Sequence, residues 1–211
     1  MCGGGDGITI NTGNVRLALE GHTITAGVGA NRAIAVNVGN PPPGRSNIHI
    51  LGPGLITNGG GNTFSAGVNL AFAFNSEVSG ITVLGSGNGI VAGESSFLTI
   101  TANTLGRNVI GMNLGNAFLS TISENDVSGN ATGILVINDV LSTLGTVSHN
   151  IINGNTLAGV SILSAAGGAT FQNNVTNGNG QYGISVVGPG PTGVVRNVEI
   201  TNKYVVGGRK F

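Results

Sequence analysis

Charge is scarce in this chain of 211 residues: only 8% of the residues are charged, and eight Lys and Arg balance eight Asp and Glu. Nucleic-acid binding needs a basic patch that neutralises phosphates, which eight scattered cations do not supply. Disordered chains combine low hydrophobicity with high net charge, whereas here the mean hydropathy is +0.30 and the net charge is zero. The composition therefore excludes a nucleic-acid partner and indicates a folded protein.

Long apolar runs and paired cysteines are also missing. A membrane-spanning helix needs about 20 apolar residues, but runs such as GVNLAFAF, residues 67–74, are interrupted by Asn or Gly long before that length. Cys2 is the only cysteine, so the chain has neither an intrachain disulfide nor a cysteine-based metal cluster. No three His or carboxylates share a ligand-like spacing. We therefore expect no membrane span, no metal site and no cofactor.

The first residues lack the features of a signal peptide. The chain opens directly into GGGDGITI, without a charged region followed by an apolar one. This start is typical either of an intracellular protein or of the trimmed mature part of an exported one, and we favour the exported protein, in which Cys2 has lost an upstream partner. The expected location is extracellular or periplasmic.

Glycine is abundant, with 39 residues, and it marks an internal repeat. The pattern Gly, apolar, any residue, apolar recurs at intervals of 22, 22, 22, 26 and 24 residues. It begins at Gly67, Gly89, Gly111, Gly133, Gly159 and Gly183. Weaker copies start at Gly7 and Ala33, and a long insertion over about 39–62 follows the second of them. A fixed period of this length is typical of repeat architectures.

Two columns of asparagine share this drifting period. The first contains Asn103, Asn125, Asn150 and Asn174, and the second, five residues later, contains Asn108, Asn130, Asn155 and Asn179. We expect each column to stack from coil to coil through side-chain amides, which satisfies polar groups that would otherwise be buried without partners. Asn150 is expected to take a left-handed backbone conformation at its corner, because asparagine tolerates it.

Apolar residues alternate with period 2 over three to five residues, which is typical of short strands, and no window has a helical period. Short strands in units of 22–26 residues can close into coils that stack on one another. The sequence predicts an all-β parallel β-helix of about eight coils that forms a single domain over residues 1–211. Its interior should contain Ile134, Val136, Val147 and Ile152.

The segment NVRLALEGHTITA, residues 14–26, and the units of type GIxV and TISxNxVSGN resemble right-handed parallel β-helix proteins of the pectate-lyase-like superfamily. The resemblance is closest to exported proteins with the carbohydrate-binding and sugar-hydrolase repeat and to the nitrous-oxide-reductase accessory type. It extends from Gly5 to about Asn202. The resemblance implies a right-handed coil, export, and work on polysaccharides or cell surfaces.

Few residues offer acid-base chemistry. Glu124 directly precedes Asn125 and His149 directly precedes Asn150, so both should hold equivalent positions on neighbouring coils, about 5 Å apart. Asp126 is two residues from Glu124. A histidine beside a carboxylate can act as a general base, and we take these three residues as the catalytic candidates. The alternative interpretation is a surface ion pair on the ladder. His49, in NIHI, is expected to be an outward strand residue.

Two other surfaces follow from strand alternation. Outward positions of the second strand of each coil should carry a hydroxyl-rich array, a candidate surface for ligand or ice. It contains Thr99, Thr101, Thr121, Ser123, Thr146, Ser148 and Thr170, followed by Gln172.

Outward positions of the first strand are uncharged, which predicts no catalytic groove there. Leu135, Ile137, Leu163 and Val187 form a candidate apolar interface, for a partner or for self-association as a homo-oligomer, unless a loop shields it.

Three functions follow from these features. The first is a secreted scaffold that presents a long surface to carbohydrate or to a protein partner, and it is favoured by abundant repeats and scarce charge. The second is an enzyme acting on polysaccharide, a lyase or a glycoside hydrolase, which uses Glu124, Asp126 and His149. The third is an ice- or surface-binding protein that uses the Thr and Ser array.

Overall fold

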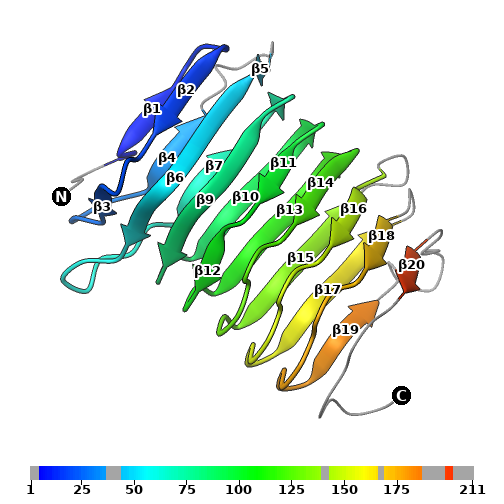
Figure 1. The fold of residues 1–211 in the computed structure, drawn as a ribbon. Coiled ribbons are helices and arrows are strands. Elements are labelled where there is room, and N and C mark those ends of the chain that lie inside the picture. The colour runs from blue at the N-terminus through cyan, green and yellow to red at the C-terminus, as the bar shows by residue number, and fades with distance from the viewer. Residues whose placement is uncertain (1–4, 37–43, 139–142, 166–168, 187–197, 202–211) are drawn as a thin grey trace.

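The structure, a computed structural model, describes residues 5–36, 44–138, 143–165, 169–186 and 198–201. Two parallel sheets run along a stack of coils, with β1 at one end and β19 and β20 at the other (Figure 1). The first sheet contains, in order, β1 (Ile8–Ile10), β4 (Arg32–Val36), β7 (Ala66–Leu70), β10 (Asn88–Ser96), β13 (Ile110–Phe118), β15 (Thr132–Asn138), β17 (Ala158–Ala165) and β19 (Tyr182–Val186).

The second sheet follows the same course. It contains β2 (Val15–Ala18), β6 (Ile48–Thr57), β9 (Glu77–Leu84), β11 (Thr99–Thr101), β14 (Ser120–Ser123), β16 (Gly145–Ser148), β18 (Ala169–Gln172) and β20 (Val198–Thr201). Short strands β5 (Arg45–Ser46) and β8 (Ala73–Phe74) extend the first sheet, and β3 (Thr23–Thr25) and β12 (Thr104–Gly106) extend the second. The predicted all-β parallel β-helix is confirmed, with about seven turns.

Each strand pairs in parallel with its equivalent in the next coil, as Ile100 does with Ile122. Within the segment 39–62, expected to be an insertion, the described residues include β5 and β6. Strand β6 pairs with β2 on one side and β9 on the other, so it belongs to the stack. No helix in the described part of the chain is long and apolar enough to cross a membrane.

The interior of the coil is filled by apolar side chains that stack in columns. On the first sheet, one column of fully buried residues follows the strand register from coil to coil. It contains Val68, Ile90, Met112, Ile134 and Val160. The second sheet and the following corner supply Val147 and Ile152, also fully buried. The expected inward positions, with Val136, are confirmed. Burial of each such side chain contributes roughly 1.5–3 kcal/mol, and this holds the coils together.

The two asparagine columns lie inside the coil and are continuous. The backbone N–H and the Nδ2 of Asn103 both donate to Oδ1 of Asn125, each at 3.0 Å. The same pair of hydrogen bonds joins Asn125 to Asn150 and Asn150 to Asn174. In the second column the same pair of hydrogen bonds joins Asn108 to Asn130 and Asn155 to Asn179, and the backbone N–H of Asn130 donates to Oδ1 of Asn155. Both predicted ladders are therefore confirmed.

The left-handed residue at each corner is the one before the ladder asparagine. The φ angle is +54° at Ala102, +58° at Glu124, +57° at His149 and +54° at Asn173. The expectation that Asn150 itself has left-handed geometry is wrong, because its φ is not positive. The preceding residue makes the turn and leaves its own side chain exposed, while the asparagine side chain is buried.

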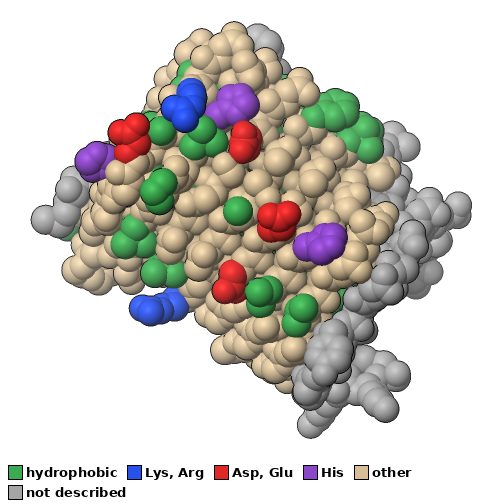
Figure 2. Space-filling model, viewed as in Figure 1, with side chains coloured by type: hydrophobic (Ala, Val, Ile, Leu, Met, Phe, Trp, Pro, Cys, Tyr) green, Lys and Arg blue, Asp and Glu red, His purple; other side chains and the backbone are tan. Residues whose placement is uncertain are grey.

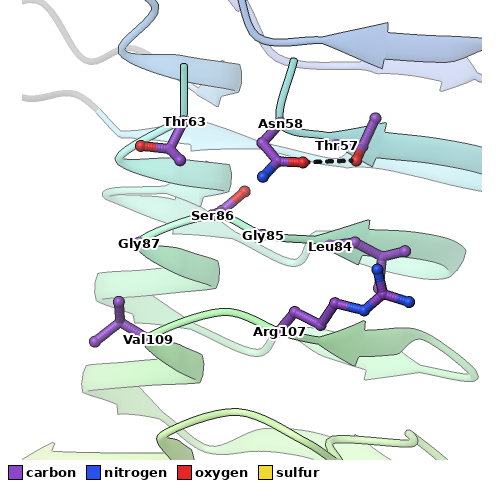
Figure 3. Close-up of a pocket in the computed structure, with 9 residues that line it drawn as sticks. All are labelled: Thr57, Asn58, Thr63, Leu84, Gly85, Ser86, Gly87, Arg107 and Val109. Carbon is purple, nitrogen blue, oxygen red and sulfur yellow. Dashed lines mark hydrogen bonds between the residues drawn. The ribbon is translucent and has the colours of Figure 1, made fainter. Parts of the chain in front are cut away.

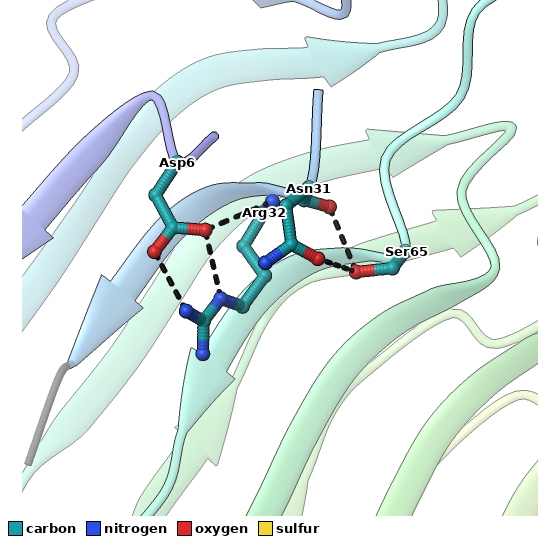
Figure 4. Close-up of polar contacts among 4 residues, drawn as sticks. All are labelled: Asp6, Asn31, Arg32 and Ser65. Atoms are coloured by element: carbon teal, nitrogen blue, oxygen red, sulfur yellow. Dashed lines mark hydrogen bonds and ion pairs between the residues drawn. The ribbon is translucent and has the colours of Figure 1, made fainter. Parts of the chain in front are cut away.

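Polar contacts join the first three coils (Figure 4). The Asp6 carboxylate accepts hydrogen bonds from the Nε and Nη2 atoms of Arg32 at 2.8 and 2.7 Å. On the next coil, the Ser65 hydroxyl donates to Asn31, with its Oγ 2.8 Å from the carbonyl oxygen and 2.7 Å from Oδ1. These contacts tie together coils in which the asparagine ladders do not run.

Candidate functional site

Two columns of polar side chains lie on the outer face of the second sheet. Strand register places Thr99, Thr121, Thr146 and Thr170 on successive coils. The second column, two residues further along each strand, contains Thr101, Ser123, Ser148 and Gln172. We call Thr99, Thr101, Thr121, Ser123, Thr146 and Thr170 the hydroxyl array. The structure thus aligns the residues that the sequence suggested, and their role in binding stays a prediction.

Exposure within these columns is uneven. Thr99 and Thr121 are exposed, and Thr101 is half-buried, with its Oγ1 3.3 Å from Oγ of Ser123. Ser148 is 7% exposed, so the expectation that it belongs to the open surface is wrong. Strand alternation alone does not set exposure, because serine is short and its neighbour in the next coil is the longer Gln172.

Charged residues continue the first of these columns toward the N-terminus. Register places Glu77 beside Thr99, His49 beside Glu77, and Arg16 beside His49. His49 Nδ1 lies 3.0 Å from Glu77 Oε2, and its Nε2 lies 2.9 Å from Asn47 Oδ1. His49 is on the outer face as expected. Its pairing with Glu77 was missed, because the spacing of 28 residues departs from the repeat of 22–26.

Two hydrogen bonds favour the charged form of the Glu77 carboxyl. The hydrogen bond from His49, together with one from the Ser79 hydroxyl at 2.8 Å, holds the pKa of the Glu77 carboxyl below its usual value of 4.5. Partial burial opposes this shift, because it disfavours the charged form. Glu77 is therefore a carboxylate at neutral pH, available as a hydrogen-bond acceptor at the end of the hydroxyl array.

Glu124 and His149 hold equivalent corner positions on adjacent coils, as the sequence predicted. Both are exposed and left-handed, and the Glu124 backbone N–H donates to the carbonyl oxygen of Ser148 at 3.3 Å. The ion pairs within the described residues do not include this pair. His149 Nε2 instead lies 3.3 Å from the side-chain nitrogen of Asn173. Asp126, also exposed, pairs through its backbone with Thr104 and Ile151. A catalytic role for the three residues stays a prediction.

A family model described as the right-handed β-helix region matches residues 86–202. The chain belongs to the right-handed β-helix family. This assignment agrees with the expected handedness of the coil. The match names no narrower group, so the likeness to pectate-lyase-like and nitrous-oxide-reductase accessory proteins stays a prediction. Searches of curated proteins and of solved structures gave no significant match.

The apolar candidates of this β-helix lie on the outer face of the first sheet. Ile137 is 43% exposed and Leu163 is 40% exposed, whereas Leu135 is half-buried. The register shifts between Val136 and Ile137, so that Ile137 pairs with Ser164 and Leu163 is the extra residue of a bulge. Val187 lies outside the described residues. We call Leu135, Ile137 and Leu163 the apolar patch.

Elsewhere the surface offers few charged groups. On the face seen in Figure 2, charged side chains lie in small, separate groups on a largely uncharged surface. Within the described part of the chain, no three His, Cys, Asp or Glu residues come together in a group able to hold a metal ion. The described surface therefore offers mainly hydroxyl groups for hydrogen bonding, together with a few isolated charges.

Proposed function

We propose that this β-helix is a secreted binding protein that holds an extended carbohydrate along the hydroxyl array. The observation that carries the proposal is the register of Thr99, Thr121 and Thr146, which repeats one hydroxyl per coil at about the 4.8 Å strand spacing. Each hydroxyl can donate and accept, as sugar hydroxyls require. A row of such groups on a rigid sheet suits an elongated polymer better than a compact ligand.

The borders of the hydroxyl array support a carbohydrate ligand. Phe97 is 51% exposed and left-handed, two residues before Thr99. It packs edge-to-face on Phe118 with ring centroids 6.3 Å apart, which fixes its ring. An exposed aromatic ring can cover the apolar face of a sugar. Glu77 and His49, at the end of the same column, add groups that bond to sugar hydroxyls.

The carbohydrate proposal is tested by binding to a panel of neutral and acidic polysaccharides, measured by affinity electrophoresis and calorimetry. Thr121→Tyr adds a large ring in the middle of the hydroxyl array and should abolish retention by the bound glycan. Gly93→Tyr is the matched control, because a side chain at Gly93, on the first sheet, meets nothing within 4 Å at its Cβ. Binding that survives Thr121→Tyr, or that Gly93→Tyr also removes, would contradict the proposal.

The other ligand proposed for this scaffold is a protein partner. The apolar patch on the first sheet supports self-association or docking of a protein there, since exposed Ile137 and Leu163 favour burial. Secretion is part of the same proposal and rests on the resemblance to exported β-helices. Detection of the native protein in the extracellular or periplasmic fraction tests it.

Catalysis on polysaccharide is the second candidate. It is favoured by the placement of Glu124 and His149 one coil apart, with Asp126 two residues from Glu124. Incubation with neutral and uronate-containing glycans should then give products that Glu124→Gln removes. Glycan binding without product, in the wild-type protein, favours the scaffold.

Ice binding is the third candidate and rests on the in-register Thr column. The second column departs from threonine at Ser123, Ser148 and Gln172, which an ice-matching lattice does not favour. Thermal hysteresis that Thr121→Tyr abolishes would support ice binding over glycan binding.

A further inference from the structure

The second asparagine ladder ends beside a cleft. Asn108, the last asparagine of that ladder toward the N-terminus, accepts at Oδ1 from the backbone N–H of Ser86 at 2.8 Å. Ser86 takes the ladder position one coil away, but its side chain is too short to extend the ladder. Beyond it lies a cleft of about 390 Å³. The residues around the cleft are Thr57, Asn58, Thr63, Leu84, Gly85, Ser86, Gly87, Arg107 and Val109 (Figure 3).

The side chain of Ser86 is polar, buried and without a partner. Ser86 is 3% exposed, and its Oγ has no hydrogen-bond partner among the described residues. Figure 3 shows the hydroxyl pointing toward the side chain of Asn58, across the cleft. A buried hydroxyl without a partner is uncommon in folded proteins, because its desolvation is not offset. Because the Ser86 hydroxyl lies at the cleft, a ligand bound there can supply its missing hydrogen-bond partner.

Arg107 supplies a cation to the same cleft. Its guanidinium, exposed and reaching past Leu84 in Figure 3, is not part of either ion pair found among the described residues. A guanidinium is a planar fork that matches a carboxylate with two parallel hydrogen bonds. A carboxylate bound in the cleft would therefore give the Arg107 guanidinium a partner of opposite charge.

Two glycines let the floor of the cleft pack closely against the loop of residues 58–65. At Gly85, φ is +74°, and an added Cβ would lie 2.9 Å from the Asn58 side chain. At Gly87, an added Cβ would lie 2.8 Å from the carbonyl oxygen of Ser65. A side chain at either position would displace this loop of residues 58–65. That loop is itself held by two backbone hydrogen bonds between Gly59 and Asn62.

We propose that this cleft binds a carboxylate that carries neighbouring hydroxyl groups, such as an acidic sugar. The carboxylate pairs with Arg107, and the ligand hydroxyls bond to Ser86, Thr63 and the Asn58 amide. The apolar surfaces of Leu84 and Val109 face the carbon skeleton. A volume of about 390 Å³ is in the range of small-molecule sites. The cleft is separate from the hydroxyl array, since β12 lies between Thr101 and Arg107 along the coil.

The test uses the whole chain and glucuronate as the probe, with backbone amide NMR shifts of Gly85, Ser86 and Gly87 as the readout. Glucose lacks the carboxylate and acetate lacks the hydroxyls, so both should bind at least about tenfold more weakly than glucuronate. Glucuronate that binds no more tightly than acetate would overturn the proposal. A trisaccharide ending in glucuronate distinguishes a free acid from the end of a polymer as the natural ligand. A site for a polymer end binds the trisaccharide as tightly as the monomer, whereas a site for the free acid binds it more weakly.

Arg107→Gly is the decisive variant. Arg107 has φ of +57°, and the matching corners of other coils carry glycine, as at Gly129 and Gly154, so the fold is expected to tolerate it. It should weaken glucuronate binding at least about tenfold, whereas Arg16→Gln, on the second sheet, should leave it unchanged. Ser86→Ala should weaken binding without lowering the melting temperature. Equal binding by wild type and Arg107→Gly would overturn the proposal, whatever the hydroxyl array binds.

Discussion

Oδ1 of Asn125 accepts two hydrogen bonds from Asn103, one from the backbone N–H and one from Nδ2, both at 3.0 Å. The Asn125 Nδ2 in turn donates to Oδ1 of Asn150 at 2.9 Å and to the carbonyl oxygen of Ile100 at 2.9 Å. One side chain thus joins three successive coils. Because all these groups are buried, none can exchange its partner for water.

Asn125→Ala should therefore strongly destabilise the protein. It removes hydrogen bonds on both sides and leaves buried donors and acceptors unpaired, at about 1–3 kcal/mol for each such group. We expect a loss of about 3–5 kcal/mol in the free energy of unfolding, measured by urea denaturation. Asn173→Gly, at an exposed corner, is the control and should change it by less than about 1 kcal/mol. A similar, small effect for both variants would mean that the ladder contributes little.

His149 should be replaceable by glycine without loss of stability. Its φ of +57° strains a residue with a Cβ, by about 1–2 kcal/mol, while glycine takes this conformation freely. His149→Gly should leave the melting temperature unchanged or raise it. Asn150→Gly, one residue later, should lower it markedly because it breaks the ladder. A large loss from His149→Gly would show that its side chain holds the coil.

The His49–Glu77 pair predicts a pH dependence of stability. The folded-state pKa of Glu77 is lowered, so its contribution is fully present above the unfolded-state pKa and is lost as the pH falls through the folded-state value. The difference in unfolding free energy between wild type and Glu77→Gln should be constant near neutral pH and shrink below the usual value of 4.5. His49→Gln should move the pKa of Glu77 upward, as followed by carboxyl NMR shifts. An unchanged pKa would contradict the assigned cause.

The apolar patch predicts self-association that a single charge removes. Ile137→Lys places a charge on the outer face of the first sheet, where Ile137 is 43% exposed, so the monomer fold should tolerate it. Sedimentation velocity should show a wild-type oligomer that this variant dissociates. Thr99→Lys, on the other sheet, should leave the oligomer intact. A monomeric wild-type protein would remove the self-association proposal.

Periodicity in the sequence was sufficient to predict the coil, its core and both asparagine ladders. Residues such as Asn103 and Asn125 recur at a nearly constant spacing, and in a solenoid equal spacing means vertical contact. Backbone geometry was harder to predict, because the pattern marks the asparagine but the turn is made by the residue before it, as at His149.

Contacts that break the period could not be predicted. His49 and Glu77 are 28 residues apart, since the coil that runs from β4 to β7 is longer than the others, and the repeat gives no sign of their pairing. The cleft at Arg107 depends on where a ladder ends and on the loop of residues 58–65, which are features of one coil alone. The burial of Ser148 likewise depends on its surroundings rather than on alternation.

The hydroxyl array, the core columns and the ladders all depend on coils stacked in register, and nuclear Overhauser contacts between methyl groups test this most directly. With Thr and Ile methyl labelling, coils stacked in register should give contacts between Thr99 and Thr121, between Thr121 and Thr146, and between Ile100 and Ile122. Thr99 and Thr146, two coils apart at about 9–10 Å, should show none. Absence of the three predicted contacts, or a direct contact from Thr99 to Thr146, would contradict the stacking and the binding face built on it.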